Sequence, residues 1–386
     1  MDSSHIRLQL AVFALVSASF ANIYITQPVL PVLQNEFSVD LIVVSFTVSA
    51  VILGIAISNL PFGVLVDRMS IRPIIFIGGL MVALGGIVCA MTGSIWLLIG
   101  ARFLQGLFLP ALTTCIAAFL AKTLPLDRLK VVMGSYVAAQ VFGGMSGRFL
   151  GGWIHPPLHW RYAFVSASVI VLVSMFIALQ NLPRSTMPER KGDDSISFVS
   201  LLKRWELVRI YLCAAGGFFV FSSLFNYLPF RLISSPFLLS TEAITLLYLV
   251  FILGVMMGPI AGRVSNRFGS GVTLIGGGMI LVISLFLILM PSIIAVVAGL
   301  MGLCAGFFAM HTSAVGLLNS RLISGQGRAN ALYVMFYYAG GWVGITCCGF
   351  AYKYGGWNAV VYLCFAILFI PLSVGIGEFR RERLDT

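Results

Sequence analysis

The chain has 386 residues, of which 59% are hydrophobic and 10% are charged, and its formal net charge at pH 7 is +11. A water-soluble domain carries about 25% charged residues, so this composition excludes a soluble globular protein and predicts a chain whose solvent is lipid. A charge of +11 would suit a nucleic-acid partner, but the basic residues fall between long apolar segments, which excludes that class.

The apolar segments predict an all-α membrane protein. A spanning helix needs about 20 apolar residues, and runs of this length satisfy their backbone in lipid only as helices. Twelve segments qualify: 8–33, 41–66, 73–92, 95–120, 130–151, 161–182, 208–231, 241–263, 271–290, 293–318, 330–352 and 358–377. With both termini in the cytoplasm, 19 of the 24 Lys and Arg residues lie on the inner side, which predicts this orientation.

The longest polar stretch divides the spans six and six. We expect an N-terminal six-helix bundle over 1–182, a cytoplasmic linker with an interfacial helix over 183–207, and a C-terminal six-helix bundle over 208–386. In the linker, apolar residues at helical spacing followed by a basic end indicate a helix that lies on the inner leaflet.

A basic turn occurs once in each half. Gly63 is followed four positions on by Asp67 and then by Arg68, with Arg72 near the end of the turn. The second half repeats this spacing with Gly262, Asn266 and Arg267. Asn22 and Tyr24 near Pro28 are likewise echoed by Asn226 and Tyr227 near Pro229. The repeats predict two pseudo-symmetric bundles around a site at the midplane of the membrane.

These motifs resemble those of the major facilitator superfamily of secondary transporters, over nearly the whole chain. Besides the turn at Gly63–Arg72, Arg102-Phe-Leu-Gln105-Gly106 is similar to the Arg-x-x-Gln-Gly signature of the family's fourth span. The stretch Gly143–Gly152 is similar to the antiporter signature of the fifth span. Its sequence most resembles that of bacterial YnfM-type and drug:proton antiporter-1-type inner-membrane transporters. Arg148 stands where that signature has Pro, and Ser70 and Ile71 replace a Gly and a basic residue of the turn.

The resemblance implies a transporter of the bacterial inner membrane that works as a monomer by alternating access. Proton-coupled efflux of a small organic solute is the favoured function. The alternative is a metabolite uptake system or uniporter without proton coupling, which the lack of a mid-span carboxylate favours. The seven cysteines have no zinc-ligand spacing, and no nucleophile–base pair or phosphate loop is present. We therefore expect no enzyme activity, no metal and no cofactor.

Candidate functional residues follow from the motifs and from buried polarity. By resemblance, Asp67 pairs with a cation and gates the transporter; Arg68 and Arg72 are the local candidates. An ionised Arg102 inside the membrane needs a hydrogen-bond acceptor. It either takes part in solute binding or proton coupling, or it bonds to carbonyls at a helix end. Arg148 is either a cation of the cavity or an anchor at the interface. His311 suits a proton relay, although a lone histidine on an apolar helix is more often structural.

By resemblance, spans one, four, seven and ten line the cavity. The remaining candidates for solute binding or coupling are Asn22, Tyr24, Gln27, Gln105, Asn226 and Tyr227. A cavity of this composition with a buried arginine suits a neutral or anionic organic solute.

Overall fold

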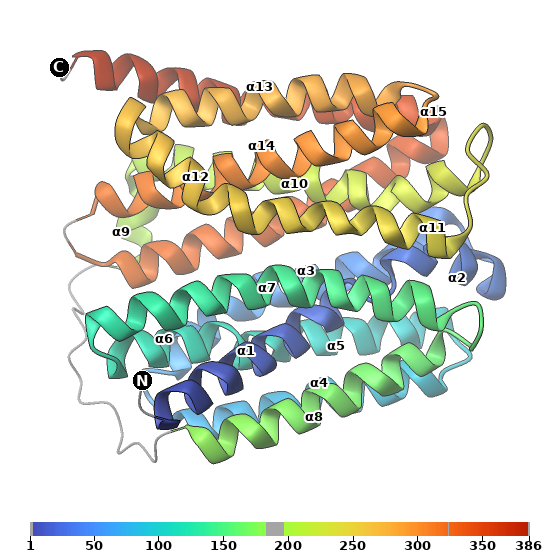
Figure 1. Ribbon diagram of the computed structural model, residues 1–386, viewed down its shortest axis with the longest axis horizontal. Coiled ribbons are helices and arrows are strands. Elements are labelled where there is room, and N and C mark those ends of the chain that lie inside the picture. The colour runs from blue at the N-terminus through green and yellow to red at the C-terminus, as the bar shows by residue number, and fades with distance from the viewer. Residues whose placement is uncertain (1–2, 183–196, 323, 385–386) are drawn as a thin grey trace. The chain divides into compact units, whose positions relative to one another are not determined.

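The computed structural model describes residues 3–182, 197–322 and 324–384, and within these ranges the chain is helical and contains no strand (Figure 1). It divides into two compact units. Unit 1 takes the described residues of 1–192 together with Thr241–Tyr248; unit 2 takes those of 193–240 and 249–386. The predicted bundle over 208–386 thus gives one short segment, Thr241–Tyr248, to the first unit.

Unit 1 contains the helices of the first six predicted spans and one short helix from the eighth. Apolar runs form these helices, and a polar residue follows several of them, as Ser38 follows α2 and Thr92 follows α4. Their bounds are α1 (Ser3–Tyr24), η1 (Gln27–Val29), α2 (Leu30–Phe37), α3 (Leu41–Leu65), α4 (Ile71–Met91), α5 (Ile95–Leu112), α6 (Thr114–Thr123), α7 (Leu126–Ile154), α8 (Arg161–Asn181) and α11 (Thr241–Leu246).

Unit 2 contains the remaining spans and a short helix, α9, in the region where the interfacial helix is predicted. The bounds are α9 (Phe198–Lys203), α10 (Trp205–Ile233), α12 (Ile252–Phe268), α13 (Ser270–Leu289), α14 (Ile293–Ser320) and α15 (Gln326–Leu384). The 3-10 helix η2 (Leu247–Phe251) leads into α12, and its first two residues, Leu247 and Tyr248, belong to unit 1. Residues 183–196 of the predicted linker lie outside the described residues; α9 lies within the predicted interfacial helix.

Ten helical stretches among the described residues are long and apolar enough to cross a membrane. One of them, α15, merges the predicted spans 330–352 and 358–377 across Gly356, which has non-helical backbone angles. The predicted span 130–151 lies within α7, which is not among the ten. The all-α class is confirmed, and the twelve predicted spans are consistent with these helices.

The helix pairing repeats between the units. In unit 1, α1 packs on α7 and α8, α3 packs on α5, and α4 packs on α5 and α8. In unit 2, α10 packs on α15, α12 packs on α14, and α13 packs on α14 and α15. Read in span order, the first, second and third spans of each unit meet the same partners, as the internal repeat predicts.

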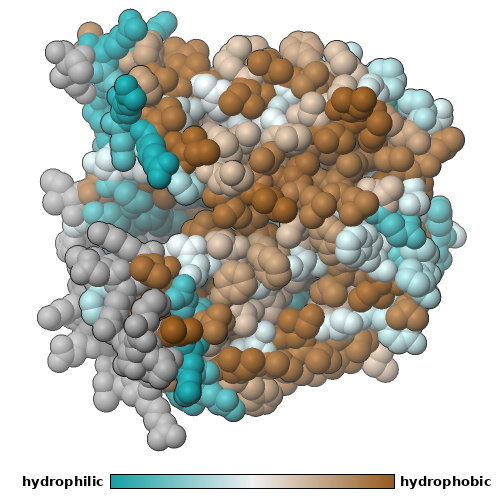
Figure 2. All heavy atoms as spheres, in the orientation of Figure 1, coloured by the Kyte–Doolittle hydropathy of each residue, from teal (hydrophilic) through white to brown (hydrophobic). Residues whose placement is uncertain are grey.

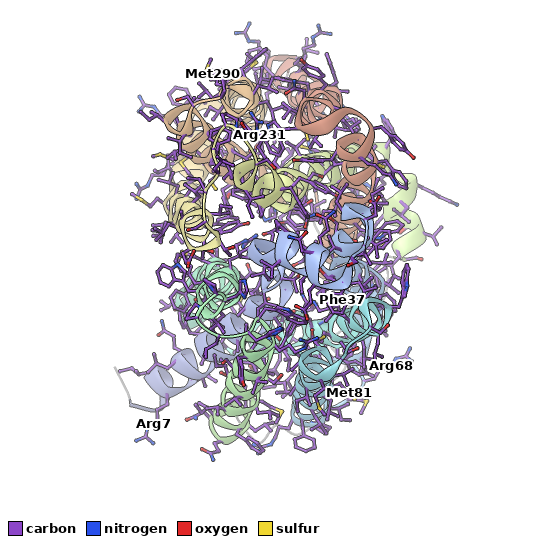
Figure 3. All side chains as sticks on the ribbon, turned by 90° about the vertical axis from the view of Figure 1, so that its right-hand side faces the viewer. Arg7, Phe37, Arg68, Met81, Arg231 and Met290 are labelled. Carbon is purple, nitrogen blue, oxygen red and sulfur yellow. The ribbon has the colours of Figure 1, made fainter. Side chains whose placement is uncertain are left out.

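Large apolar side chains are exposed on the outer helices. Phe76, Ile77 and Leu84 of α4 are exposed, as are Val173 and Phe176 of α8. Figure 2 shows apolar side chains over the middle of the visible helices and hydrophilic ones toward the helix ends. Figure 3 shows Arg7 and Arg68 directed away from the packed helices of unit 1. This distribution is stable in lipid and costly in water.

Three predicted spans are interrupted. Span one divides into α1, η1 and α2, span four divides at Thr113 into α5 and α6, and span eight divides into α11, η2 and α12. In span one the interruption coincides with Pro28 and Pro31, which lack the backbone N–H that a continuous helix requires. The sequence reasoning treated each of these as a single helix.

The last helix continues past the predicted end of the span at 377. Glu378 is 1% exposed and accepts hydrogen bonds from Arg209 Nη2 at 3.1 Å and from Arg321 Nη2 at 2.6 Å. One turn later, Glu382 Oε1 accepts from the backbone nitrogen of Ser270 at 2.8 Å, at the start of α13. The end of α15 is thereby attached to the ends of α10, α14 and α13.

Candidate functional site

The first span is broken in unit 1, and the break creates unpaired backbone groups. Helix α1 ends at Tyr24 and η1 begins at Gln27. The last four carbonyls of an α-helix have no intrahelical donor, so the end of α1 requires donors from elsewhere. Two buried arginines lie on the two sides of this break.

Arg102 of α5 supplies donors to the end of α1. Its Nη1 donates to the carbonyl oxygen of Asn22 at 2.6 Å and its Nη2 to that of Ile23 at 2.7 Å. Its Nε donates to the carbonyl oxygen of Thr47 on α3 at 2.9 Å, and the whole residue is 0% exposed. A cation at a helix C-terminus also complements the helix dipole. This is the contact to helix-end carbonyls that we considered for Arg102; its role in coupling stays a prediction.

Two predicted amide side chains join Arg102. Gln105 Oε1 accepts from Arg102 Nη1 at 2.7 Å, and Gln105 Nε2 donates to the carbonyl oxygen of Val82 at 2.9 Å. Asn22 Nδ2 donates to the carbonyl oxygen of Ala18 at 2.9 Å. The structure therefore brings Asn22, Arg102 and Gln105 into one buried hydrogen-bonded cluster that links α1, α3, α4 and α5.

Arg148 of α7 lies on the other side of the break. Its Nε donates to Gln27 Oε1 at 2.6 Å and its Nη1 to the carbonyl oxygen of Gly144 at 2.7 Å. The guanidinium carbon is 4.1 Å from the ring centroid of Tyr24 and 5.0 Å from that of Tyr248. Arg148 is 2% exposed and Gln27 0%, so the structure brings Gln27 and Arg148 into a second buried cluster with the half-buried ring of Tyr24. It does not place Arg148 at a surface, which is what the anchor interpretation requires.

Close helix approach positions this second cluster. An ideal Cβ at Gly147 would lie 2.0 Å from the carbonyl oxygen of Ala21, and one at Gly151 would lie 1.9 Å from that of Ile25. Glycine is therefore required at both positions for α7 to lie against α1 and its continuation. Arg148, adjacent to Gly147, is carried to the level of the break by this contact.

The corresponding span of unit 2 is not broken. Helix α10 runs from Trp205 to Ile233 with Pro229 inside it, and Asn226 and Tyr227 are both 0% exposed. The Tyr227 hydroxyl donates to the carbonyl oxygen of Ile345 at 2.7 Å.

Aromatic rings fill the neighbouring core of unit 2. Phe218 stacks on Tyr337 with ring centroids 3.8 Å apart, and Phe221 stacks on Phe307 at 4.1 Å. The ring of Phe307 is 5.9 Å from that of His311 and nearly parallel to it, so the stack continues into the imidazole.

His311 lies at a small cavity inside unit 2. Its Nδ1 is 3.0 Å from the hydroxyl oxygen of Tyr333. The cavity has a volume of about 10 Å³, which is close to the space that one water molecule needs. Its lining residues are Cys213, Ala214, Gly217, Phe307, Met310, His311, Ala314 and Tyr333. The predicted candidates of unit 2 therefore lie in two places, with Tyr227 bonded to Ile345 and His311 at this cavity.

In the basic turn of unit 1, the acidic residue is paired with a lysine from another helix and not with the arginines of the turn. Asp67 is paired with Lys122 at the end of α6, and the two side chains are 57% and 44% exposed. Arg72 Nη1 instead donates to the carbonyl oxygen of Leu182 at 3.4 Å, and Arg68 is exposed. A Cβ at Gly63 would meet nothing within 4 Å, so close packing does not require glycine there.

The echo of this turn in unit 2 is helical. Asn266 and Arg267 lie in the last turn of α12, which ends at Phe268, and both are exposed. The guanidinium carbon of Arg267 is 5.2 Å from the ring centroid of Phe268. Within the described ranges 3–182, 197–322 and 324–384, no three His, Cys, Asp or Glu side chains gather as a metal site would require.

Sequence reasoning missed four contact residues. Lys122 and Glu378 were treated only as charges at span ends, although a charge one turn beyond a span is a usual partner for another such charge. Tyr248 and Thr47 carried no signal, because an aromatic ring or a backbone carbonyl in an apolar run is ordinary. The contacts of Tyr248 and Thr47 with the two arginines lie at the break in span one, which only the structure shows.

Comparisons with known proteins agree with this architecture. The model of the Major Facilitator Superfamily matches residues 12–344. The inner membrane transport protein YnfM of Escherichia coli is 29% identical over 380 residues, covering 97% of this chain and 91% of that protein. The uncharacterized MFS-type transporter YybF of Bacillus subtilis is 27% identical over 399 residues, covering 98% and 96%.

Solved structures share the fold. A bacterial homolog of the human lysosomal transporter Spinster, in an inward-facing and unoccupied conformation, has a TM-score of 0.72 at 14% identity and covers 98% of this chain and 94% of its own. The human organic anion transporter MFSD10 has a TM-score of 0.72 at 16% identity and covers 97% of this chain and 100% of its own.

Proposed function

We propose, because this chain belongs to the Major Facilitator Superfamily and is a multi-pass membrane transporter, that it exports a small organic solute across the bacterial inner membrane by alternating access in exchange for protons. The observation that carries the proposal is the broken first span with its two buried arginines. Ionisable side chains inside spans are costly and mark transport pathways, and discontinuous spans form solute sites in transporters.

His311 is the residue that we assign to proton coupling. It is the histidine of α14, it bonds to the Tyr333 hydroxyl, and it lines a cavity that has room for about one water. A histidine imidazole can accept and release a proton, and a tyrosine with a water can pass that proton on. The proposed exporter acts as a monomer with both termini in the cytoplasm. This orientation puts 19 of the 24 Lys and Arg residues on the cytoplasmic side, as is usual for membrane proteins.

The uptake or uniport alternative has one observation in its favour. The described carboxylates of both units lie near helix ends or in turns, and none is at the middle of a span: Glu36, Asp40, Asp67, Glu206, Glu242, Glu378 and Glu382. A transporter without a mid-span carboxylate must couple protons through another group or not at all.

Everted membrane vesicles from cells that make the chain separate these functions. The vesicle lumen is acidified, and a pH-sensitive dye reports proton exit on addition of lipophilic drugs, sugars, amino acids and organic acids. The exporter predicts that at least one compound releases protons, that Tyr333→Phe slows this release, and that His311→Gln abolishes it. Saturable solute flux that does not depend on the pH gradient, or proton release that survives His311→Gln, would contradict the proposed coupling.

A further inference from the structure

Arg231, in the last turn of α10, carries donors that no part of the described chain uses. No hydrogen bond or ion pair of this residue is found among the described residues. Its Nε is buried and unpartnered, whereas Nη1 and Nη2 are unpartnered and not buried. A guanidinium presents its N–H donors in its own plane, so the edge formed by the two Nη atoms is open to an acceptor from outside the chain.

The end of α10 does not need these donors. A cation in the last turn of a helix commonly bonds to the carbonyls that have no intrahelical partner. Here the segment that follows the helix supplies the donors. Ser234 Oγ donates to the carbonyl oxygen of Phe230 at 2.9 Å, and the backbone nitrogen of Leu239 donates at 2.9 Å to the carbonyl oxygen of Leu232. A capping role therefore does not account for Arg231.

The acids of unit 2 lie far from this arginine. The described carboxylates of the unit are Glu206, Glu378 and Glu382. Glu206 lies 25 residues before Arg231 on the same helix, which is about 37 Å along its axis. Glu378 lies at that distant end too, because it bonds to Arg209 near the start of α10. Arg231 is partly buried and has no counter-charge in its unit, so an anion from outside the chain would stabilise it.

Aromatic rings surround this end of unit 2. The ring of Phe237 lies over the guanidinium, with its centroid 5.0 Å from the guanidinium carbon. The ring of Tyr352 lies 5.7 Å from that of Tyr227 and 6.2 Å from that of Phe230. Tyr352 is within electrostatic range of Arg231, and its hydroxyl makes no hydrogen bond among the described residues, so it is a second open donor. Figure 3 shows Arg231 within the outline of the unit 2 helices.

We propose that Arg231 binds the carboxylate of an apolar organic acid, at the end of unit 2 that is predicted to face outward. The edge with Nη1 and Nη2 matches a carboxylate in shape and charge, and Tyr352 supplies a further donor. The rings of Tyr227, Phe230 and Tyr352 suit the apolar body of the acid. A neutral amide lacks the charge and turns its own NH₂ toward these donors, so the site rejects it. The inference goes beyond the proposed function, because binding here requires neither export nor proton coupling.

The test uses the full chain purified in an uncharged detergent at neutral pH, with benzoate and its neutral counterpart benzamide as probes. The unfolding midpoint is followed against probe concentration, because a ligand that binds the folded protein raises the midpoint. We expect benzoate at about a hundred times its Kd to raise the midpoint by about 3 °C, and benzamide to leave it unchanged. Equal shifts from the two probes would overturn the site.

Arg231→Gln is the decisive variant, because it removes the charge and the planar edge. We expect an affinity for benzoate at least about tenfold weaker, and an unliganded midpoint within about 1 °C of the wild type, because Arg231 bonds to nothing in the described chain. Arg231→Lys keeps the charge without the edge and should weaken binding severalfold. Lys353→Gln is the matched control: it removes the same charge from the same end of unit 2 and should change the affinity less than about twofold.

Three results would overturn the site. A markedly lower unliganded midpoint in Arg231→Gln would show that the arginine supports the fold. An equal loss of benzoate affinity in Lys353→Gln would show that the probe responds to net charge alone. A shift that phosphatidylglycerol produces and Arg231→Gln removes, without any shift from benzoate, would assign the arginine to a lipid phosphate.

The outcome is separable from that of the proposed function. Acid-specific binding that Arg231→Gln removes, without proton-linked flux in vesicles, would support the site and contradict the proton coupling. Proton-linked flux together with equal binding of benzoate and benzamide would overturn the site and leave the exporter.

Discussion

The same backbone arrangement is filled in different ways in the two units. In unit 1 the first helix of span one, α1, ends at Tyr24, and buried Arg102 and Arg148 lie at the break that follows. In unit 2 the seventh span runs unbroken through Pro229, and stacked aromatic rings fill the neighbouring core. The close contacts are nevertheless repeated, with Gly147 against Ala21 and Gly344 against Phe219.

The difference shows how a membrane protein can hold a buried arginine. Inside a continuous helix each carbonyl already accepts one intrahelical bond and can accept only one more, as Thr47 on α3 and Gly144 on α7 do. A broken helix exposes carbonyls, and Arg102 uses those of Asn22 and Ile23. We infer that the break and the arginines depend on each other, whereas the unbroken span of unit 2 requires only apolar contacts.

The largest expected effect comes from removing the guanidinium at the break. Arg102→Met leaves the two buried helix-end carbonyls of Asn22 and Ile23 without this donor, whereas the Thr47 carbonyl lies inside α3 and keeps its helical bond. At roughly 1–3 kcal/mol for each unsatisfied group, the loss in unfolding free energy is about 4 kcal/mol. Chemical unfolding in detergent measures it. The exposed Arg68→Met is the control, with an expected change within about 0.5 kcal/mol. Equal stability of the two variants would show that the break does not depend on Arg102.

Glu378→Gln gives the next largest effect and tests the attachment of α15 to α10 and α14 in unit 2. It removes a carboxylate that is 1% exposed and bonded to Arg209 and Arg321, which are themselves 26% and 21% exposed on their side chains. Breaking a buried pair costs about 3–5 kcal/mol, and because the arginines are partly exposed we expect about 3 kcal/mol. Added salt should change this cost little, in contrast to the exposed pair of Asp67 and Lys122 in unit 1.

Gly147→Ala and Gly344→Ala test what the units share. The new Cβ would lie 2.0 Å from the Ala21 carbonyl oxygen in unit 1, and 2.7 Å from Ser223 Oγ in unit 2. Overpacking of this kind costs about 1–3 kcal/mol, so we expect about 2 kcal/mol in each unit, with the larger value at Gly147. Gly134→Ala on the same helix α7 is the control, because a Cβ there meets nothing within 4 Å. A cost in only one unit would contradict a shared scaffold.

The helices and their duplication could be predicted from the sequence, because long apolar runs and a recurring Gly-x-x-x-(Asp/Asn)-Arg spacing are local signals. The sequence indicated Asn22, Arg102 and Gln105 only as separate polar residues. That they form one cluster could not be predicted, because the cluster depends on where α1 ends. Pro28 and Pro31 were visible, but a proline inside a span does not by itself break it: α10 passes through Pro229. The partner of Asp67 was also beyond local reasoning, because Lys122 is 55 residues away.

The smallest stability change is expected at Asp67, which makes it the clearest probe of function. Its side chain is 57% exposed and its pair with Lys122 is screened by water, so Asp67→Ala should change the unfolding free energy by less than about 1 kcal/mol. If the pair gates alternating access, solute flux in vesicles should nevertheless fall severalfold at unchanged expression, and Lys122→Met should reproduce the fall. Full flux in Asp67→Ala would show that this pair is a surface contact with no part in gating.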